Sequence, residues 1–443
     1  MSLPNPASPT TLLLLTALLS RLTTTLLLLL SSRLSPYDAS STAFFSADFT
    51  PPSSPSPTSK ATTHLSTHLL PFVRWDAVYF LGIAERGYRY EQEFAFFPGL
   101  MIGMRGFAGA IPFGNLRDRL VITGVLISNA SFVAAAVLLY KLGLTVLGPS
   151  HHRTSLTAAL LFCITPAGAF MSAPYTESLF AATSFLGMLC VARKRYLSAA
   201  VSFAAASAVR ANGIVHMGFF VWEFVVVPGM LMLRRVGGKT SIAALIRNIL
   251  RATFYSLIVI SPFIAFQTYA YTLFCPAADS SLRPWCNATS PLIYSFVQKE
   301  YWNNGFLTYY RLHQLPNFLL ALPIFTLLFT GLLQCITHDP LAFFTLGRLT
   351  QPKSQPPPLL IITNPALAPH IYLMTALTIY CATMMHVQVV VRFSTSLPGL
   401  YWVAGGLMGG DARRGKWGRL VVGYFLGYAG ATTVLFGGFL PPA

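Results

Sequence analysis

Long apolar stretches without a charged residue decide what this chain can fold into. Five of them exceed the roughly 20 residues that a helix needs to cross a bilayer, at 120–140, 252–274, 315–337, 371–391 and 420–440. Only 10% of the residues are charged, whereas an average soluble domain has about 25%. A soluble globule would lack polar surface, so the sequence predicts an all-α polytopic membrane protein built as a multi-span helical bundle.

Further apolar segments are weaker candidates for spans. The first, 11–31, contains Arg21, and we interpret it as an uncleaved anchor because it lacks the basic start of a signal peptide. The others are 155–172, 174–192 and 196–233, the last long enough for two crossings. If the segment 95–112 crossed the membrane, the later loops would lie on the wrong sides. We therefore expect this apolar segment to form an interfacial helix on the lumenal side.

Basic residues outnumber acidic ones by 30 to 13. They gather between the apolar runs, which is typical of cytosolic loops and does not favour nucleic-acid binding. The clusters lie at 193–195, 234–251, 348–353 and 413–419. With these in the cytosol, the chain forms one membrane domain, 1–443, with two large lumenal loops, 32–119 and 275–314. Pro-rich segments at 50–58 and 352–358 are typical of linkers.

The second lumenal loop contains features of secreted domains. Asn287 begins a glycosylation sequon, and Cys275 and Cys286 are candidates for a disulfide, which needs an oxidising lumen. The sequon at Asn129 lies inside a predicted span, so the motif alone is weak. The other four cysteines lie in apolar runs and are expected to be buried thiols.

Acidic residues are few, yet four of the 13 fall between Asp76 and Glu93 in the first lumenal loop. A carboxylate at the bilayer edge, partly desolvated by Trp75 and Phe80, is a candidate general base for a hydroxyl group. Two structural interpretations stay open. Asp76 caps a helix that starts at Ala77, or the aromatic residues form an interfacial belt.

Other polar residues stand at the expected lumenal ends of spans: Glu177, Arg210, Asn212, Trp302, Asn303, His386, Gln388 and Arg392. Glu177 fits the first turn of a helix, where the dipole favours an anion, and capping is its favoured role. Arg210 needs a partner or water at this depth. Arg392 is placed to meet a phosphate, although snorkelling to the surface is an equal alternative for both arginines.

Motifs of soluble enzymes, such as a P-loop, HExxH or GxSxG, do not occur in the sequence. His64 and His68 have i,i+4 spacing but no evident third ligand, so we expect no metal site.

Several strings are similar to one known family. They are FVRWDAVYFLGIAERGYRYEQEFAFFPG (72–99), FCITPAGAFMSAPYTESLF (162–180), AVRANGIV (208–215), YWNNGFLTYYRLHQLPNFLLALP (301–323) and HVQVVVRFSTSLPGLYW (386–402). In these strings the chain resembles the GPI mannosyltransferase 2 family. It lacks a long cytosolic insertion before the last span that we associate with animal members.

The resemblance implies an endoplasmic-reticulum membrane enzyme of the GT-C glycosyltransferase class with its active site facing the lumen. Such an enzyme transfers the second mannose of the GPI precursor, in α-1,6 linkage, from dolichyl phosphate mannose. The family also implies a small membrane partner subunit in fungi. No cofactor is firmly implied, because the leaving group is a lipid phosphate that arginines can stabilise.

The resemblance also implies roles for particular residues. An acidic residue of the first lumenal loop acts as base in this class, which points to Asp76. Arg74, Arg210 and Arg392 are candidates for the phosphate. Glu91 and Glu93 are expected to orient acceptor hydroxyls, and aromatic residues near Trp75 to stack on sugars.

Two other classes of function remain as alternatives. A lipid transporter or flippase would place charges near mid-membrane, whereas here the carboxylates gather at one face. A structural subunit of a membrane assembly would need no recurring polar residues at the ends of its spans.

Overall fold

The computed structural model describes residues 8–34, 37–38, 40–45, 64–234, 242–275, 283–347, 349, 364–408 and 412–441. The described residues form helices and no strand, which confirms the all-α prediction. The expected linkers 50–58 and 352–358 lie outside the described residues.

The helices follow the chain as α1 (Pro9–Ser31), α2 (Ser40–Phe45), α3 (His64–Leu69), α4 (Asp76–Arg86), α5 (Gly99–Phe107), α6 (Leu116–Val146), α7 (His152–Cys163), α8 (Glu177–Ala192), α9 (Tyr196–Val209), α10 (Met217–Val221), α11 (Val227–Arg234), α12 (Ile242–Phe274), α13 (Ile293–Glu300), α14 (Leu315–His338), α15 (Pro340–Phe344), α16 (Ala368–Thr383), α17 (Val390–Phe393), α18 (Pro398–Met408) and α19 (Ala412–Gly437).

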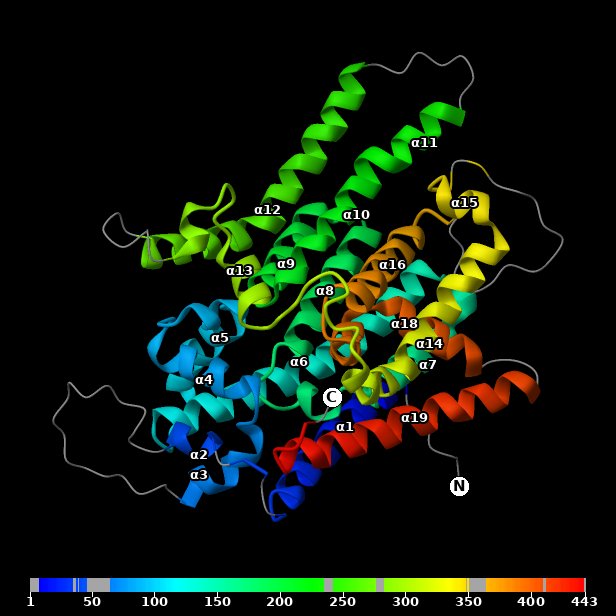
Figure 1. Cartoon of the computed structure of the whole chain (residues 1–443). Helices are drawn as coiled ribbons and strands as arrows, with labels where there is room; N and C mark the ends of the chain where they lie inside the picture. The colour runs from blue at the N-terminus through cyan, green and yellow to red at the C-terminus, as the bar shows by residue number, and fades with distance from the viewer. Residues whose placement is uncertain are drawn as a thin grey trace.

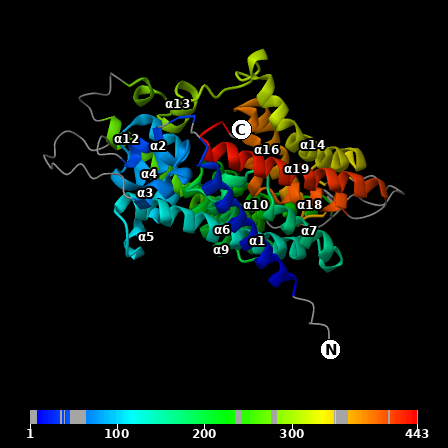
Figure 2. The same ribbon diagram turned by 90° about the horizontal axis from the view of Figure 1, so that it is seen from below.

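Helix α6 runs through the middle of the molecule and packs against α8, while α8 packs against α9 and α9 against α12. Helices α2 to α5 lie together at one end, and α14 and α16 lie at the other (Figure 1, Figure 2). The first and last of these helices, α1 and α19, pack against each other, with Gly437 of α19 against Ser31 of α1. The helix expected within 95–112 is present as α5, which packs against α4 and α6.

Six helices in the described part of the chain are long and apolar enough to cross a membrane. They are Pro9–Ser31, Leu116–Val146, Ala211–Met232, Ile242–Phe274, Leu312–His338 and Gly415–Gly437. Four of the five firm spans and the weaker candidate 11–31 therefore coincide with helices of sufficient length. The segment 196–233 divides after α9, at Arg210, as its length predicts.

The prediction of one continuous span over 371–391 is wrong. Helix α16 has 16 residues, which is about 24 Å, and it ends at Thr383. At His386 the backbone is extended, with φ −61° and ψ 116°. Hydropathy averages over a run of residues and does not detect such a turn, which here brings residues 385–393 to a cavity.

The span expected over 155–172 is also interrupted, because α7 ends at Cys163. Residues 165–176 are buried and contain one short 3₁₀ turn. Non-helical backbone inside a membrane protein is tolerated where protein groups satisfy it. Here Arg21 Nη1 donates to the Gly168 carbonyl at 3.4 Å, and Asn129 Nδ2 donates to the Ser172 carbonyl at 3.3 Å. The sequon residue Asn129 thus has a structural role.

The hairpin of α8 and α9 has two chemically different ends. Its turn carries the basic cluster 193–195, where Lys194 forms an ion pair with Glu223 and Tyr196 donates a hydrogen bond to the same carboxylate. Its open end carries Glu177 and Arg210. The basic cluster and these two residues are therefore separated by the length of the hairpin.

The described part of the 275–314 loop contains α13 and the confirmed disulfide between Cys275 and Cys286, whose Cα atoms are 5.7 Å apart. Of the remaining cysteines, Cys163, Cys335 and Cys381 are buried, whereas Cys190 is partly exposed.

Gly124 offers a test of how α6 positions the non-helical segment. A Cβ at this residue would lie 2.6 Å from Pro174 Cβ and 2.8 Å from Met104 Sδ. We expect Gly124→Ala to lower the apparent melting temperature of the detergent-solubilised protein, because overpacking costs about 1–3 kcal/mol. Gly427→Ala in α19, where a Cβ meets nothing within 4 Å, should keep or raise it. Equal melting temperatures for the two variants would contradict this packing.

Candidate functional site

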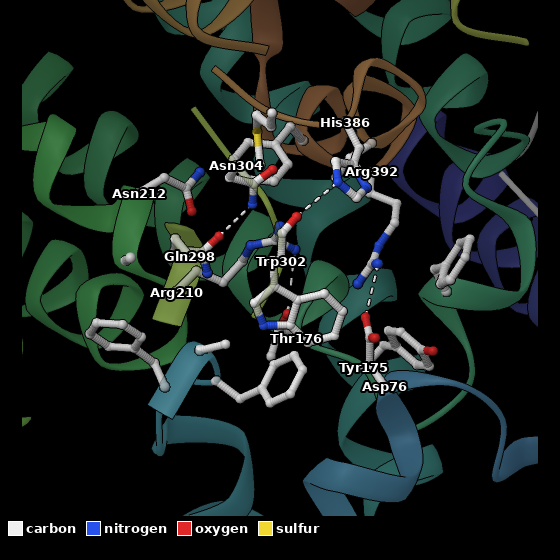
Figure 3. Close-up of a pocket in the computed structure, with 18 of the residues that line it drawn as sticks. Asp76, Tyr175, Thr176, Arg210, Asn212, Gln298, Trp302, Asn304, His386 and Arg392 are labelled. Atoms are coloured by element: carbon white, nitrogen blue, oxygen red, sulfur yellow. Dashed lines mark hydrogen bonds and ion pairs between the residues drawn. The ribbon is translucent and has the colours of Figure 1, made fainter. Parts of the chain in front are cut away.

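A cavity of about 400 Å³ lies where seven parts of the chain meet. Its walls come from the start of α4, the segment before α5, residues 170–176, the junction after α9, the α13 region through Asn304, residues 385–393, and Pro441 after α19. Aromatic rings form much of the wall, and a few polar side chains converge on it (Figure 3). This combination is typical of ligand sites.

Asp76 is the first residue of α4, and its carboxylate extends toward Arg392 (Figure 3). Arg392 Nη1 donates to Asp76 Oδ2 at 3.0 Å. The residue before it, Trp75, has a positive φ of 52°, which is uncommon for a bulky side chain and is held by surrounding structure. The Trp75 ring packs edge-on against Phe439, with centroids 5.1 Å apart. The alternative in which Asp76 caps a helix starting at Ala77 does not account for this ion pair, and α4 begins one residue earlier, at Asp76.

Glu177 holds two arginines at once. Its Oε1 accepts from Arg392 Nε at 2.6 Å and from Arg210 Nη1 at 2.8 Å. The side chain of Glu177 is fully buried, so removing this carboxylate would take a shared partner from two guanidiniums at once, which is costly in a protein interior. The favoured prediction of a capping role for Glu177 is therefore incomplete, whereas the prediction that Arg210 needs a partner is confirmed.

The guanidinium of Arg392 is further enclosed by aromatic rings. Its Cζ lies 4.6 Å from the ring centre of Phe170 and 5.2 Å from that of Tyr175. Burial alone would lower the pKa of Arg392, but the carboxylates of Glu177 and Asp76 raise it above its usual value. Arg392 is thus a permanent, fixed cation facing the cavity.

The four charged residues Asp76, Glu177, Arg210 and Arg392 form what we call the charged cluster. Two positive and two negative formal charges cancel, so the cluster is neutral as it stands. An added anion can therefore compete with a carboxylate for an arginine. Among the described residues, no group of three or more His, Cys, Asp or Glu side chains is arranged to hold a metal ion.

Uncharged polar residues line the rest of the cavity. Of the predicted residues, Asn212, Trp302, His386 and Gln388 lie here. His386 Nε2 pairs with the Trp302 carbonyl at 3.0 Å (Figure 3). Burial lowers the pKa of His386, although this hydrogen bond opposes the effect. We therefore expect a neutral ring that ties the turn after α16 to the loop after α13.

Two of the predicted site residues in the first loop face away from the cavity. Arg74 Nη1 donates to Ser41 Oγ at 2.6 Å, so its guanidinium is not placed to bind a phosphate there. Glu93 is buried, pairs with Arg86 and accepts from the Arg89 backbone amide at 2.8 Å. Both side chains stabilise the loop itself.

Glu91 and Asn303 also lie outside the cavity wall. Glu91 accepts from Trp285 Nε1 at 2.9 Å and pairs with Arg283 at 3.0 Å, which joins the two loops that the sequence predicts to be lumenal. Asn303 has a φ of 50° and supplies a turn. Asn287, the predicted glycosylation site, is exposed.

Sequence reasoning missed several residues of the wall, including Phe170, Tyr175, Thr176, Gln298, Asn304 and Phe393. Tyr175 and Thr176 directly precede Glu177, so the break at Pro174 was the signal that could have found them. Gln298 and Asn304 carry no such signal. They are ordinary polar residues until the fold brings α13 to the cavity.

Comparison with known proteins gives a consistent result. The family model described as Mannosyltransferase (PIG-V) matches residues 10–443. The chain is 37% identical to GPI alpha-1,6-mannosyltransferase 2 of Homo sapiens over 366 residues, covering 74% of this chain and 71% of the relative. It is 32% identical to GPI mannosyltransferase 2 of Cryptococcus neoformans over 400 residues (84% and 89%) and to that of Gibberella zeae over 420 residues (92% and 91%).

The double ion pair of Glu177 makes a prediction about stability. Glu177→Gln leaves two guanidiniums without their shared carboxylate, and breaking a buried pair costs about 3–5 kcal/mol. We expect a clear fall in the melting temperature of the solubilised protein. Glu223→Gln removes the carboxylate paired with the exposed Lys194 and should change it little, because exposed pairs contribute about 0–1 kcal/mol. Similar losses in both variants would contradict this account of Glu177.

Proposed function

The chain belongs to the mannosyltransferase (PIG-V) family, and we propose that it takes mannose from dolichyl phosphate mannose in the cavity at the charged cluster. As a member of this family it is a membrane glycosyltransferase of GPI-anchor biosynthesis that forms an α-1,6-mannosyl link. We propose the first mannose of the GPI precursor as acceptor and Asp76 as general base. One observation carries the proposal: in the cavity, Arg392 bridges Asp76 and Glu177.

The donor phosphate binds Arg392, with Arg210 beside it. A lipid phosphodiester carries one negative charge, and an arginine fork suits its oxygens. Glu177 keeps Nε of Arg392 occupied, so the guanidinium keeps its position while Nη1 changes partner. The phosphate thereby replaces Asp76 on Arg392 and leaves that carboxylate free.

Asp76 then accepts the proton of the acceptor hydroxyl. The hydroxyl oxygen attacks C1 of the donor mannose, the bond from C1 to the phosphate oxygen breaks, and its electron pair stays on the phosphate. A single displacement converts the β-linked donor to an α-linked product and needs one base. Negative charge grows on the leaving phosphate, where fixed arginines stabilise it.

The position of the cavity supports a lumenal active site in the endoplasmic reticulum. The charged cluster and the basic turn 193–195 lie at opposite ends of the α8–α9 hairpin, and basic loops favour the cytosol. The disulfide between Cys275 and Cys286 and the exposed Asn287 belong to the region beside the cavity, and a disulfide favours an oxidising compartment. The small membrane partner subunit stays a prediction.

Asp76→Asn tests the base. We expect at least a 100-fold loss of mannose transfer in microsomes, because an amide cannot take the proton. A one-mannose GPI intermediate should accumulate in cells that lack the endogenous enzyme. Glu85→Gln is the matched control, because Glu85 lies on the same helix but pairs with Arg117 at 2.8 Å. Full activity of Asp76→Asn at equal abundance would exclude Asp76 as the base.

Arg392→Lys tests the phosphate site. A lysine retains the charge but cannot contact Glu177 and a phosphate through a fixed fork. We expect a higher KM for dolichyl phosphate mannose and a lower kcat in microsomal transfer assays. The exposed Arg105 of α5 supplies the control, Arg105→Lys, with unchanged donor kinetics. An unaltered donor KM in Arg392→Lys would remove Arg392 from the donor site.

A further inference from the structure

Part of the cavity wall contains polar atoms for which the described residues provide no hydrogen-bond partner. They are Asn212 Nδ2, Trp302 Nε1, Asn304 Oδ1 and Gln388 Oε1, all on residues that line the cavity. An unsatisfied buried polar atom is uncommon in a native protein and is a reason to look for a ligand or water.

Two of the wall residues are held rigidly by each other. Asn304 Nδ2 donates to Gln298 Oε1 at 2.7 Å, and the Asn304 backbone amide donates to the Gln298 carbonyl at 2.9 Å (Figure 3). The same bonds orient the Asn304 amide and leave its oxygen available. Asn212 approaches from the segment after α9, beside Gln298 and Asn304 in the view of Figure 3. Such preorganised groups lose little freedom when a ligand binds.

The chemistry of this wall differs from that of the charged cluster. Side-chain amides both donate and accept hydrogen bonds and carry no charge, as do sugar hydroxyls. A phosphate would instead favour the arginines. The indole ring of Trp302 adds an apolar face next to the amides. This part of the wall therefore fits an uncharged sugar.

We infer that Asn212, Gln298 and Asn304 form a subsite of the acceptor. It binds hydroxyl groups of the acceptor sugar that do not themselves react. This inference rests on the proposed function, because it takes Asp76 and Arg392 as the reacting pair. In Figure 3, Trp302 lies between these three amides and that pair. The donor has a single sugar, bonded directly to its phosphate, so that sugar occupies the charged cluster. The amide subsite is left for the acceptor glycan.

Kinetics of transfer to a one-mannose GPI precursor test the subsite. Asn304→Leu and Asn212→Leu each remove hydrogen-bonding atoms while they retain similar size. We expect the KM for this acceptor to rise about 10-fold, as for the loss of a satisfied polar contact, with the donor KM unchanged and kcat within about threefold. Asn303→Gly is the control in the same loop, because glycine accepts its positive φ; its acceptor KM should stay at the wild-type value.

Each other outcome overturns the subsite. A higher donor KM with an unchanged acceptor KM assigns the amides to the donor sugar. An unchanged KM for both substrates means that only water fills this wall. Gln298→Met provides a second measurement if Asn304→Leu lowers the melting temperature. Failure of the proposed function is distinguishable, because wild-type protein would then transfer no mannose from dolichyl phosphate mannose.

Discussion

A buried carboxylate, that of Glu177, forms ion pairs with two arginines and so joins three segments of the chain. Glu177 begins α8, Arg210 directly follows α9 and Arg392 lies in α17. The side chain of Glu177 is fully buried. Its two ion pairs are therefore strongly coupled to the packing of three separate segments. The position of Asp76 depends on the same contacts, since its own partner is one of these arginines. The contacts that join these segments are therefore the same ones that the proposed mechanism uses.

The neutrality of the charged cluster has a chemical meaning. Asp76 and Glu177 occupy the two arginines, so no guanidinium of the cluster is left uncompensated in the protein interior. In the proposed mechanism the donor phosphate takes the place of Asp76 on Arg392, while Glu177 keeps its bond to Nε of Arg392. Fixed cations that need no reorganisation are what a site requires to stabilise a leaving phosphate.

Most of the fold could be predicted from apolar runs, but the broken segments could not. The span 120–140 was predictable because its apolar run continues for the whole width of a membrane. The interruptions at Cys163 and Thr383 were not, since the segments that follow them contact residues distant in sequence, as Arg21 contacts Gly168 and His386 contacts Trp302. The residues of the site were partly predictable: a charge at span depth, as in Arg210, requires a partner.

The sequence does not reveal which way each side chain points or which residues distant in sequence lie close in space. Asp76 and Arg392 are separated by 316 positions, and no local pattern connects them. Arg74 and Asp76 are two residues apart, yet the first contacts Ser41 and the second contacts Arg392. The left-handed backbone of Trp75 between them is a result of tertiary packing, which composition and spacing do not reveal.

The contact between the first and last helices affects how the protein is made. Helix α1 packs along α19, and Thr432 of α19 donates to the Pro166 carbonyl in the segment that α1 also supports through Arg21. During synthesis, α1 and the 165–176 segment emerge long before α19. The Pro166 carbonyl therefore has no bond from Thr432 until α19 has been made. Completion of the bundle, and of the cavity wall at Pro441, depends on a helix that is synthesised after the others described here.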